Sequence, residues 1–252
     1  MKIYISHHHS TPTVILLHGY LADHHYWDPL LPSLTSDATV VTADLLGFGA
    51  SDKPKAPSAY SFRHQAEVLH QRLHEANILP PYIVAGHSMG ALIAATFAAN
   101  YAAEVSHAVL VNPPVFPSKQ HAQQELAETG FLYNTLLYRS AGRVLWLLVI
   151  TCLPLLRLRN QELRSMSARH SDAARRGGLR AIETTDIRPV LARLTVPTDI
   201  IMAFNDRPTY RQALDDLALP KTVTVHNVTT GHHTPLEQPA VVTELLRAAI
   251  YG

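Results

Sequence analysis

A serine with a glycine two residues before it and another two residues after it stands out, in Gly86-His87-Ser88-Met89-Gly90. It follows a short apolar run and precedes an alanine-rich helical pattern. A serine at the apex of a sharp strand-to-helix turn needs strained backbone angles, and glycines at the flanking positions have no Cβ to clash there. Because the bare pattern arises by chance in roughly one such chain in fifteen, the flanking elements carry the inference. We expect Ser88 to be a nucleophile for acyl transfer; the alternative is a structural serine in a tight turn.

Two polar segments near the end of the chain could complete this chemistry. Asp206 follows an apolar run, and the pair His232 and His233 follows the next one. A serine hydroxyl is a poor nucleophile near pH 7, so a histidine must take its proton, and a carboxylate orients that histidine. Loops at the carboxyl ends of parallel strands can bring all three groups together. The order serine, aspartate, histidine matches the nucleophile-elbow arrangement, so we expect Asp206 to be the acid.

Acyl transfer also needs two N–H donors aimed at the developing oxyanion. One would be the Met89 amide, beside the serine. Gly19 follows another apolar run and lets its backbone approach closely, so the Tyr20 amide is the second candidate and the Leu21 amide the reserve. We expect His18 to hold this loop by side-chain hydrogen bonds instead of acting in catalysis.

The composition fits one large domain or a core domain with a small insert. The chain has 252 residues, 47% of them hydrophobic and 16% charged, with a net charge of +1. Residues 117–188 are basic, with eleven Lys or Arg against six Asp or Glu. Such a segment could attract anionic substrates or lipid head groups, or it could be an ordinary solvated helical surface. The overall charge favours no nucleic-acid partner.

The remaining sequence features favour a cytoplasmic protein without disulfides, membrane spans or bound metals. The single cysteine, Cys152, allows no internal disulfide and lies in an apolar run, so we expect a buried, inert thiol. The N-terminus has no apolar signal region, and the longest apolar run, residues 144–156, is too short to span a membrane. Three histidines at residues 7–9 have no partner ligands in view. We therefore expect neither metal nor cofactor.

Short β-branched runs alternate with helical patterns, which predicts an α/β fold with a mostly parallel, doubly wound sheet. The predicted strands are residues 14–17, 39–43, 82–85, 108–111, 199–203 and 222–228. The predicted helices are residues 62–76, 89–100, 210–217 and 241–250. Residues 117–188 contain helical patterns without a strand. We interpret residues 1–116 and 189–252 as the core and residues 117–188 as a helical insert.

Together these motifs resemble the α/β-hydrolase superfamily over nearly the whole chain outside the insert. Residues 44–51 read D-x-x-G-x-G-x-S and residues 231–239 read G-H-x₄-E-x-P, as is common in that family. The resemblance implies that His232, not His233, is the catalytic base. It also implies that residues 117–188 form a cap over the site. The 144–156 run would then either face the substrate or seal the cap onto the core.

The sequence departs from the family pattern at several positions. The family often has a glycine shortly before the acid, whereas this chain has Phe204 and Asn205 before Asp206. Some members take the acid from the end of the sixth strand, where this chain has the amide Asn112, and this favours Asp206. A serine at position 88 argues against haloalkane dehalogenases and epoxide hydrolases, which have aspartate there.

Three functions are compatible with these residues. The first is hydrolysis of a carboxylic ester of a small or moderately apolar substrate. The second uses the same triad on another bond, as in carbon–carbon hydrolases, thioesterases, lactonases and perhydrolases. The third is a ligand receptor without turnover. A small molecule of ester type is the expected partner; peripheral membrane contact and the oligomeric state are left open.

Overall fold

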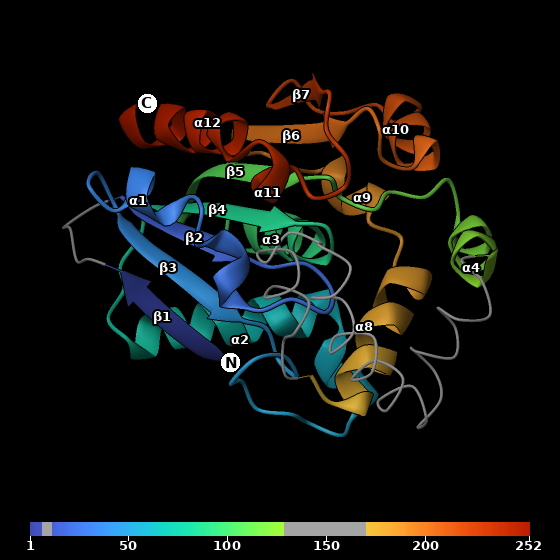
Figure 1. The fold of residues 1–252 in the computed structure, drawn as a ribbon, viewed down its shortest axis with the longest axis horizontal. Coiled ribbons are helices and arrows are strands. Elements are labelled where there is room, and N and C mark those ends of the chain that lie inside the picture. Colours follow the sequence, from blue (N-terminus) through green and yellow to red (C-terminus); the bar gives the residue numbers. More distant parts are fainter. Residues whose placement is uncertain (7–11, 129–169) are drawn as a thin grey trace, which may run out of the picture.

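The structure is a computed structural model that describes residues 1–6, 12–128 and 170–252 (Figure 1). The histidines at 7–9, Cys152 and the apolar run at 144–156 therefore lie outside the described residues. Among the described helices, none combines the length and the apolar character needed to cross a membrane.

A seven-stranded sheet forms the centre of the molecule, in the order β1-β3-β2-β4-β5-β6-β7. The pairs from β3 to β7 are all parallel, and β1 pairs antiparallel with β3 at one edge. The predicted α/β class and mostly parallel sheet are confirmed. The strands are β1 (Lys2–Ser6), β2 (Thr13–Leu17), β3 (Thr39–Asp44), β4 (Tyr82–His87), β5 (Val105–Val111), β6 (Thr198–Ala203) and β7 (Val223–Val228).

The first strand was not predicted from the sequence. Strand β1 is a partly exposed edge strand, and its apolar run, Ile3 to Ile5, is only three residues long. Central strands such as β2, where every residue is buried, show longer apolar runs because both of their faces are covered. The other edge strand, β7, is also partly exposed but was predicted from its β-branched residues.

Helices cover both faces of the sheet (Figure 1). Successive residues of β2 point to opposite faces: Val14 and Leu16 join the apolar cluster under α1 and α12, and Ile15 and Leu17 join the cluster under α2 and α3. The described helices are α1 (Leu31–Leu34), α2 (Phe62–Glu75), α3 (Met89–Asn100), α4 (Lys119–Glu128), α8 (Asp172–Thr184), α9 (Arg188–Leu191), α10 (Pro208–Asp215), α11 (Thr234–Glu237) and α12 (Pro239–Tyr251), with the 3₁₀ helices η1 (His24–Trp27) and η2 (Pro57–Tyr60).

Two helices, α4 and α8, come from the predicted insert, whose boundaries remain a prediction. Helix α8 begins at its N-cap Ser171, whose side chain accepts a hydrogen bond from the Ala174 amide. It packs closely on η2: a Cβ on Gly177 would lie 2.3 Å from Tyr60 Cδ2. A Cβ on the next residue, Gly178, would have more room, with Tyr20 Cε2 at 3.2 Å. The two adjacent glycines therefore differ in how tightly they are packed.

This difference predicts opposite outcomes for two neighbouring substitutions. Gly177→Ala should lower the free energy of unfolding by about 1–3 kcal/mol, because the methyl group overlaps the Tyr60 ring. Gly178→Ala should have a much smaller effect, since the Tyr20 ring edge can give way and alanine has the higher helix propensity. Urea unfolding of both variants measures the difference. Equal losses of stability would contradict close packing of α8 on η2.

Candidate active site

The turn between β4 and α3 places Ser88 in a strained conformation. Its backbone angles are φ 53° and ψ −119°, a left-handed φ that is rare for a residue with a side chain. A Cβ on Gly86 would lie 2.2 Å from the Gly90 carbonyl oxygen, and a Cβ on Gly90 would lie 2.3 Å from the Leu17 carbonyl oxygen. Glycine is therefore required on both sides of the serine, as the sequence pattern predicted.

Ser88, His232 and Asp206 lie in one hydrogen-bonded chain. Ser88 Oγ is 3.0 Å from His232 Nε2, and His232 Nδ1 is 2.6 Å from Asp206 Oδ2. With a proton on Nδ1, the imidazole donates to the carboxylate and accepts the serine hydroxyl proton at Nε2. The side chain of the neighbouring His233 instead lies near Tyr26, with its Nδ1 3.4 Å from the tyrosine hydroxyl. This arrangement favours His232 over His233 as the partner of the serine.

Asp206 is held at the end of β6 by its own loop. Its side chain is only 6% exposed, and its second carboxylate oxygen, Oδ1, accepts a hydrogen bond from the Arg207 amide at 2.8 Å. Both oxygens thus have partners, which fixes the carboxylate plane relative to the imidazole. No glycine is needed before Asp206 in this arrangement.

Asn112 fixes the loop that carries His232, and its role was missed in the sequence. Its buried side chain donates to the His232 carbonyl at 2.8 Å and to Thr234 Oγ1 at 2.9 Å, and it accepts from the Ala203 amide at 2.8 Å. His87 donates to the same His232 carbonyl at 2.7 Å. One amide at the end of β5 therefore joins the end of β6 to the histidine loop. A polar residue directly after a buried strand was the available signal.

The loop after β2 lies against the serine. A Cβ on Gly19 would be 3.3 Å from Ser88 Cβ and 2.8 Å from His87 Nδ1, so only glycine permits this approach. Met89 opens α3, and the first amides of a helix have no partner within it. The Met89 and Tyr20 amides remain the sequence-based candidates for the two oxyanion donors.

His18 holds the loop after β2 by side-chain hydrogen bonds, as expected. It is fully buried; the Leu45 amide donates to its Nε2 at 3.0 Å, and its Nδ1 lies 2.7 Å from the Gly19 carbonyl. These contacts require a neutral ring with the proton on Nδ1. Burial lowers the pKa of His18 to about 4. Burial and the nearby His232 likewise hold the pKa of His87 well below its ordinary value.

A cavity of about 360 Å³ opens above Ser88. Its apolar wall includes Leu126 of α4 and Leu179 and Ile182 of α8, so both described helices of the predicted insert contribute to it. Arg207 also lines the cavity, but its guanidinium is paired with Glu125 at 2.9 Å. The cavity is therefore lined by the hydrogen-bonded chain of Ser88, His232 and Asp206 and by a mostly apolar wall.

Comparison with known proteins identifies the family. A family model described as alpha/beta hydrolase fold matches residues 12–239. The chain belongs to the α/β-hydrolase family. The resemblance drawn from the sequence motifs is thereby confirmed.

Individual relatives of this α/β hydrolase cover only part of its length. It is 35% identical over 107 residues to a probable lysophospholipase, BODYGUARD 4 of Arabidopsis thaliana, across 42% of this chain and 25% of that protein. It is 34% identical over 116 residues to a 1-acylglycerol-3-phosphate O-acyltransferase of Rattus norvegicus, across 45% of this chain and 33% of that protein. The matches thus span a third or less of these relatives.

Solved structures match nearly the whole chain at low identity. A hydrolase from Pseudomonas aeruginosa has a TM-score of 0.78 and 19% identity, covering 99% of this chain and 94% of that one. An esterase from Thermogutta terrifontis has a TM-score of 0.75 and 20% identity, covering 98% and 91%. At these identities the likeness shows the shared α/β-hydrolase fold.

The D-x-x-G-x-G-x-S motif at residues 44–51 builds a loop beside the site. Asp44 is buried at the end of β3 and accepts hydrogen bonds from the His24 ring, the Tyr4 hydroxyl and the Ala50 amide, at 2.8, 2.9 and 2.7 Å. Burial would raise the pKa of Asp44, but the hydrogen bonds from His24 and Ala50 outweigh it and hold the pKa below its ordinary value. The motif therefore has a structural task, outside the serine relay.

The glycine at the start of this loop also contacts α8. Gly47 has φ 88°, and a Cβ on it would lie 2.3 Å from Ala174 Cβ. Its carbonyl accepts a hydrogen bond from the Ser171 amide at 3.1 Å. The motif thereby links the core to the helix that roofs the cavity.

Removing the donor of Asn112 should slow the chemistry of Ser88 without unfolding the protein. In Asn112→Asp the carboxylate can still accept from the Ala203 amide but cannot donate to the His232 carbonyl. We expect the rate at which a fluorophosphonate labels Ser88 to fall by about 10- to 100-fold, because the imidazole is displaced from the serine. Mass spectrometry measures the labelling rate, and circular dichroism checks the fold. An unchanged rate in folded protein would refute this positioning role.

The neutral, buried His18 should make the protein sensitive to acid. Its folded pKa of about 4 lies below the ordinary value of 6.5, so its contribution to stability is present above pH 6.5 and is lost as the pH falls toward 4. From pH 7 to pH 5 this histidine alone should remove about 2 kcal/mol from the free energy of unfolding. Urea unfolding at both pH values measures the loss. His18→Asn, which cannot titrate, should show a shallower pH dependence; an equal slope would rule out His18 as the cause.

Proposed function

We propose that this α/β hydrolase is a serine hydrolase that cleaves a carboxylic ester through an acyl-enzyme intermediate. The observation that carries the proposal is the relay from Ser88 through His232 to Asp206, with contacts of 3.0 and 2.6 Å. These separations suit proton transfer from the hydroxyl to the imidazole. The strained turn at Ser88 and its position at the floor of the cavity support the same role.

In the proposed reaction, Ser88 Oγ attacks the ester carbonyl as His232 Nε2 takes the hydroxyl proton. Asp206 stabilises the imidazolium that forms. The Met89 and Tyr20 amides are the proposed donors to the oxyanion. His232 then gives its proton to the leaving alcohol, and the carbonyl re-forms as the acyl-enzyme. A water molecule, deprotonated by His232, attacks this ester and releases the carboxylic acid and free Ser88.

The cavity favours a neutral acyl group of small or moderate size. Its volume of about 360 Å³ lies at the low end of ordinary ligand pockets. The guanidinium of Arg207, which lines the cavity, is paired with Glu125. This pair offsets positive charge that an acidic substrate of a carbon–carbon hydrolase would need. The lipid-acting names of two relatives are consistent with an acyl substrate.

The decisive experiment compares Ser88→Ala with the wild-type protein on a short-chain nitrophenyl ester. We expect the turnover to fall by a factor on the order of 10⁴, because the nucleophile is lost while the fold is retained. A matched pair, His232→Ala and His233→Ala, should separate the base from its neighbour: the first should be nearly inactive and the second should remain active. Retained turnover in Ser88→Ala would overturn the proposal.

The same preparation distinguishes the alternatives. A panel of esters, thioesters, lactones and dienoic acids identifies the bond that is cleaved, and a series of acyl-chain lengths measures the reach of the cavity. A folded wild-type protein whose Ser88 does not react with a fluorophosphonate would favour a ligand receptor. The cytoplasmic location, the extent of the cap and contact with membranes remain predictions.

A further inference from the structure

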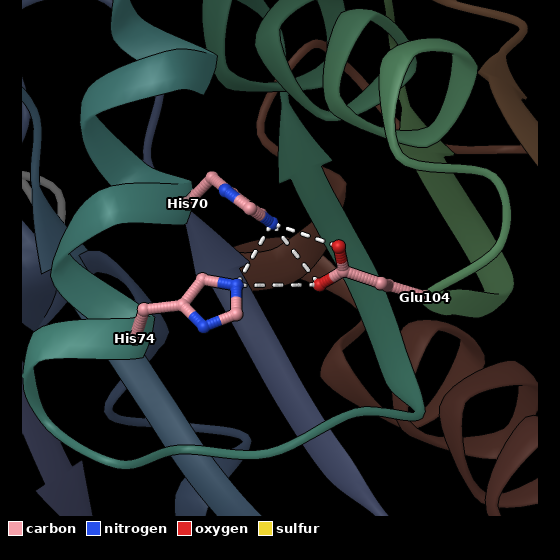
Figure 2. A group of neighbouring side chains, drawn as sticks. All are labelled: His70, His74 and Glu104. Carbon is pink, nitrogen blue, oxygen red and sulfur yellow. Dashed lines mark hydrogen bonds and ion pairs between the residues drawn. The ribbon is translucent and has the colours of Figure 1, made fainter.

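Two histidines and a glutamate gather at α2 (Figure 2). His70 and His74 are one helical turn apart on α2, so both rings project from the same face. Glu104 reaches them from the turn that follows α3. His70 Nε2 is 3.0 Å from both oxygens of Glu104, the two Nε2 atoms are 3.1 Å apart, and His74 Nε2 is 3.6 Å from Glu104 Oε2.

The three atoms lie close enough together to share one cation. The two Nε2 atoms and Glu104 Oε2 are separated by 3.0, 3.1 and 3.6 Å. One hydrogen on His70 Nε2 cannot point both at Glu104 and at His74 Nε2. If both Nε2 atoms donate to the carboxylate instead, the two nitrogens remain 3.1 Å apart with no hydrogen between them.

A cation among the three atoms would let all of them present lone pairs to it. Zinc binds imidazole nitrogen and carboxylate oxygen at about 2.0–2.2 Å, so ligands around a tetrahedral zinc lie roughly 3.3–3.5 Å apart. The observed separations of 3.0, 3.1 and 3.6 Å lie close to this range. Two histidines at this helical spacing are a recurrent zinc-binding arrangement. We propose that His70, His74 and Glu104 form a zinc-binding site.

The site has the surroundings of a bound metal. The ring of Tyr101 stacks on His70, with centroids 3.9 Å apart and planes at 2°, which fixes the orientation of this ligand. The side chain of His74 is 51% exposed, whereas those of His70 and Glu104 are 21% and 28% exposed. The open side gives zinc an entry path and room for a water ligand in the fourth position.

The location indicates a structural role for the metal. Glu104 immediately precedes β5, at the amino end of that strand, whereas Ser88 follows the carboxyl end of the parallel strand β4. The two sites therefore lie at opposite ends of the parallel strands. Zinc at this position would join α2 to the turn between α3 and β5, and it would stabilise the folded chain by binding it in preference to the unfolded chain.

Calorimetric titration of untagged protein with zinc chloride tests the site. We compare the wild-type protein with His74→Ala, Glu104→Gln and the control His64→Ala, which removes another partly exposed histidine from the same helix. We expect one zinc ion bound to the wild type and to the control, and an affinity for that ion lower by about 100-fold or more in the two ligand variants. Calcium should give no comparable heat, because it prefers oxygen ligands.

Thermal unfolding gives a second measurement that does not depend on enzyme activity. Zinc in hundredfold excess over its Kd should raise the Tm of the wild type and of His64→Ala by about 5 °C or more. This rise should be lost in His74→Ala and in Glu104→Gln. Zinc binding and a Tm rise that persist unchanged in both ligand variants would place the metal elsewhere, and absence of zinc binding to the wild type would also overturn the proposal.

Discussion

The left-handed backbone at Ser88 is the constraint on which the site depends. Such a conformation in a residue with a side chain costs on the order of 1–3 kcal/mol, so the surrounding structure must enforce it. The enforcing elements are β4, buried along its whole length, and α3, buried from Met89 to Ala98. Because these buried elements meet at the serine, its side chain cannot turn away from the cavity. The core thus holds the proposed nucleophile rigidly at the cavity.

The relay depends equally on how the strand ends are joined. Asp206 follows β6 and His232 follows β7, so the two side chains reach Ser88 from separate loops. Asn112, at the end of β5, bonds to the end of β6 and to the histidine loop. In the same loop, the Gly231 amide donates a hydrogen bond to Glu237 Oε2 at 2.7 Å. The loop of the proposed base, His232, is therefore held by contacts to Asn112 and to Glu237.

The two ends of the parallel strands have different surroundings. At the carboxyl ends, loops converge on a cavity whose apolar wall includes residues of α4 and α8. At the amino ends, α2 and the turn before β5 bring together imidazoles and a carboxylate that suit a cation.

The sequence alone determined the features that local patterns encode. Apolar runs such as residues 82–85 marked the buried strands, and Gly86 and Gly90 marked the turn at Ser88, because only glycine leaves room beside a strained serine. The order of Ser88, Asp206 and His232 placed their loops at one edge of the sheet. Strand β1 was missed because its apolar run, Ile3 to Ile5, is only three residues long.

Tertiary structure decided the contacts between residues far apart in the chain. His232 and His233 offer the same chemistry, and the family motif pointed to His232; the folded loop brings His232 to the serine and turns His233 toward Tyr26. Asn112 donates a hydrogen bond to the His232 carbonyl, 120 positions further along the chain. The approach of Glu104 to His70 spans 34 positions. No local pattern records such pairs, because packing of the sheet and helices, and not spacing along the chain, sets which polar groups meet.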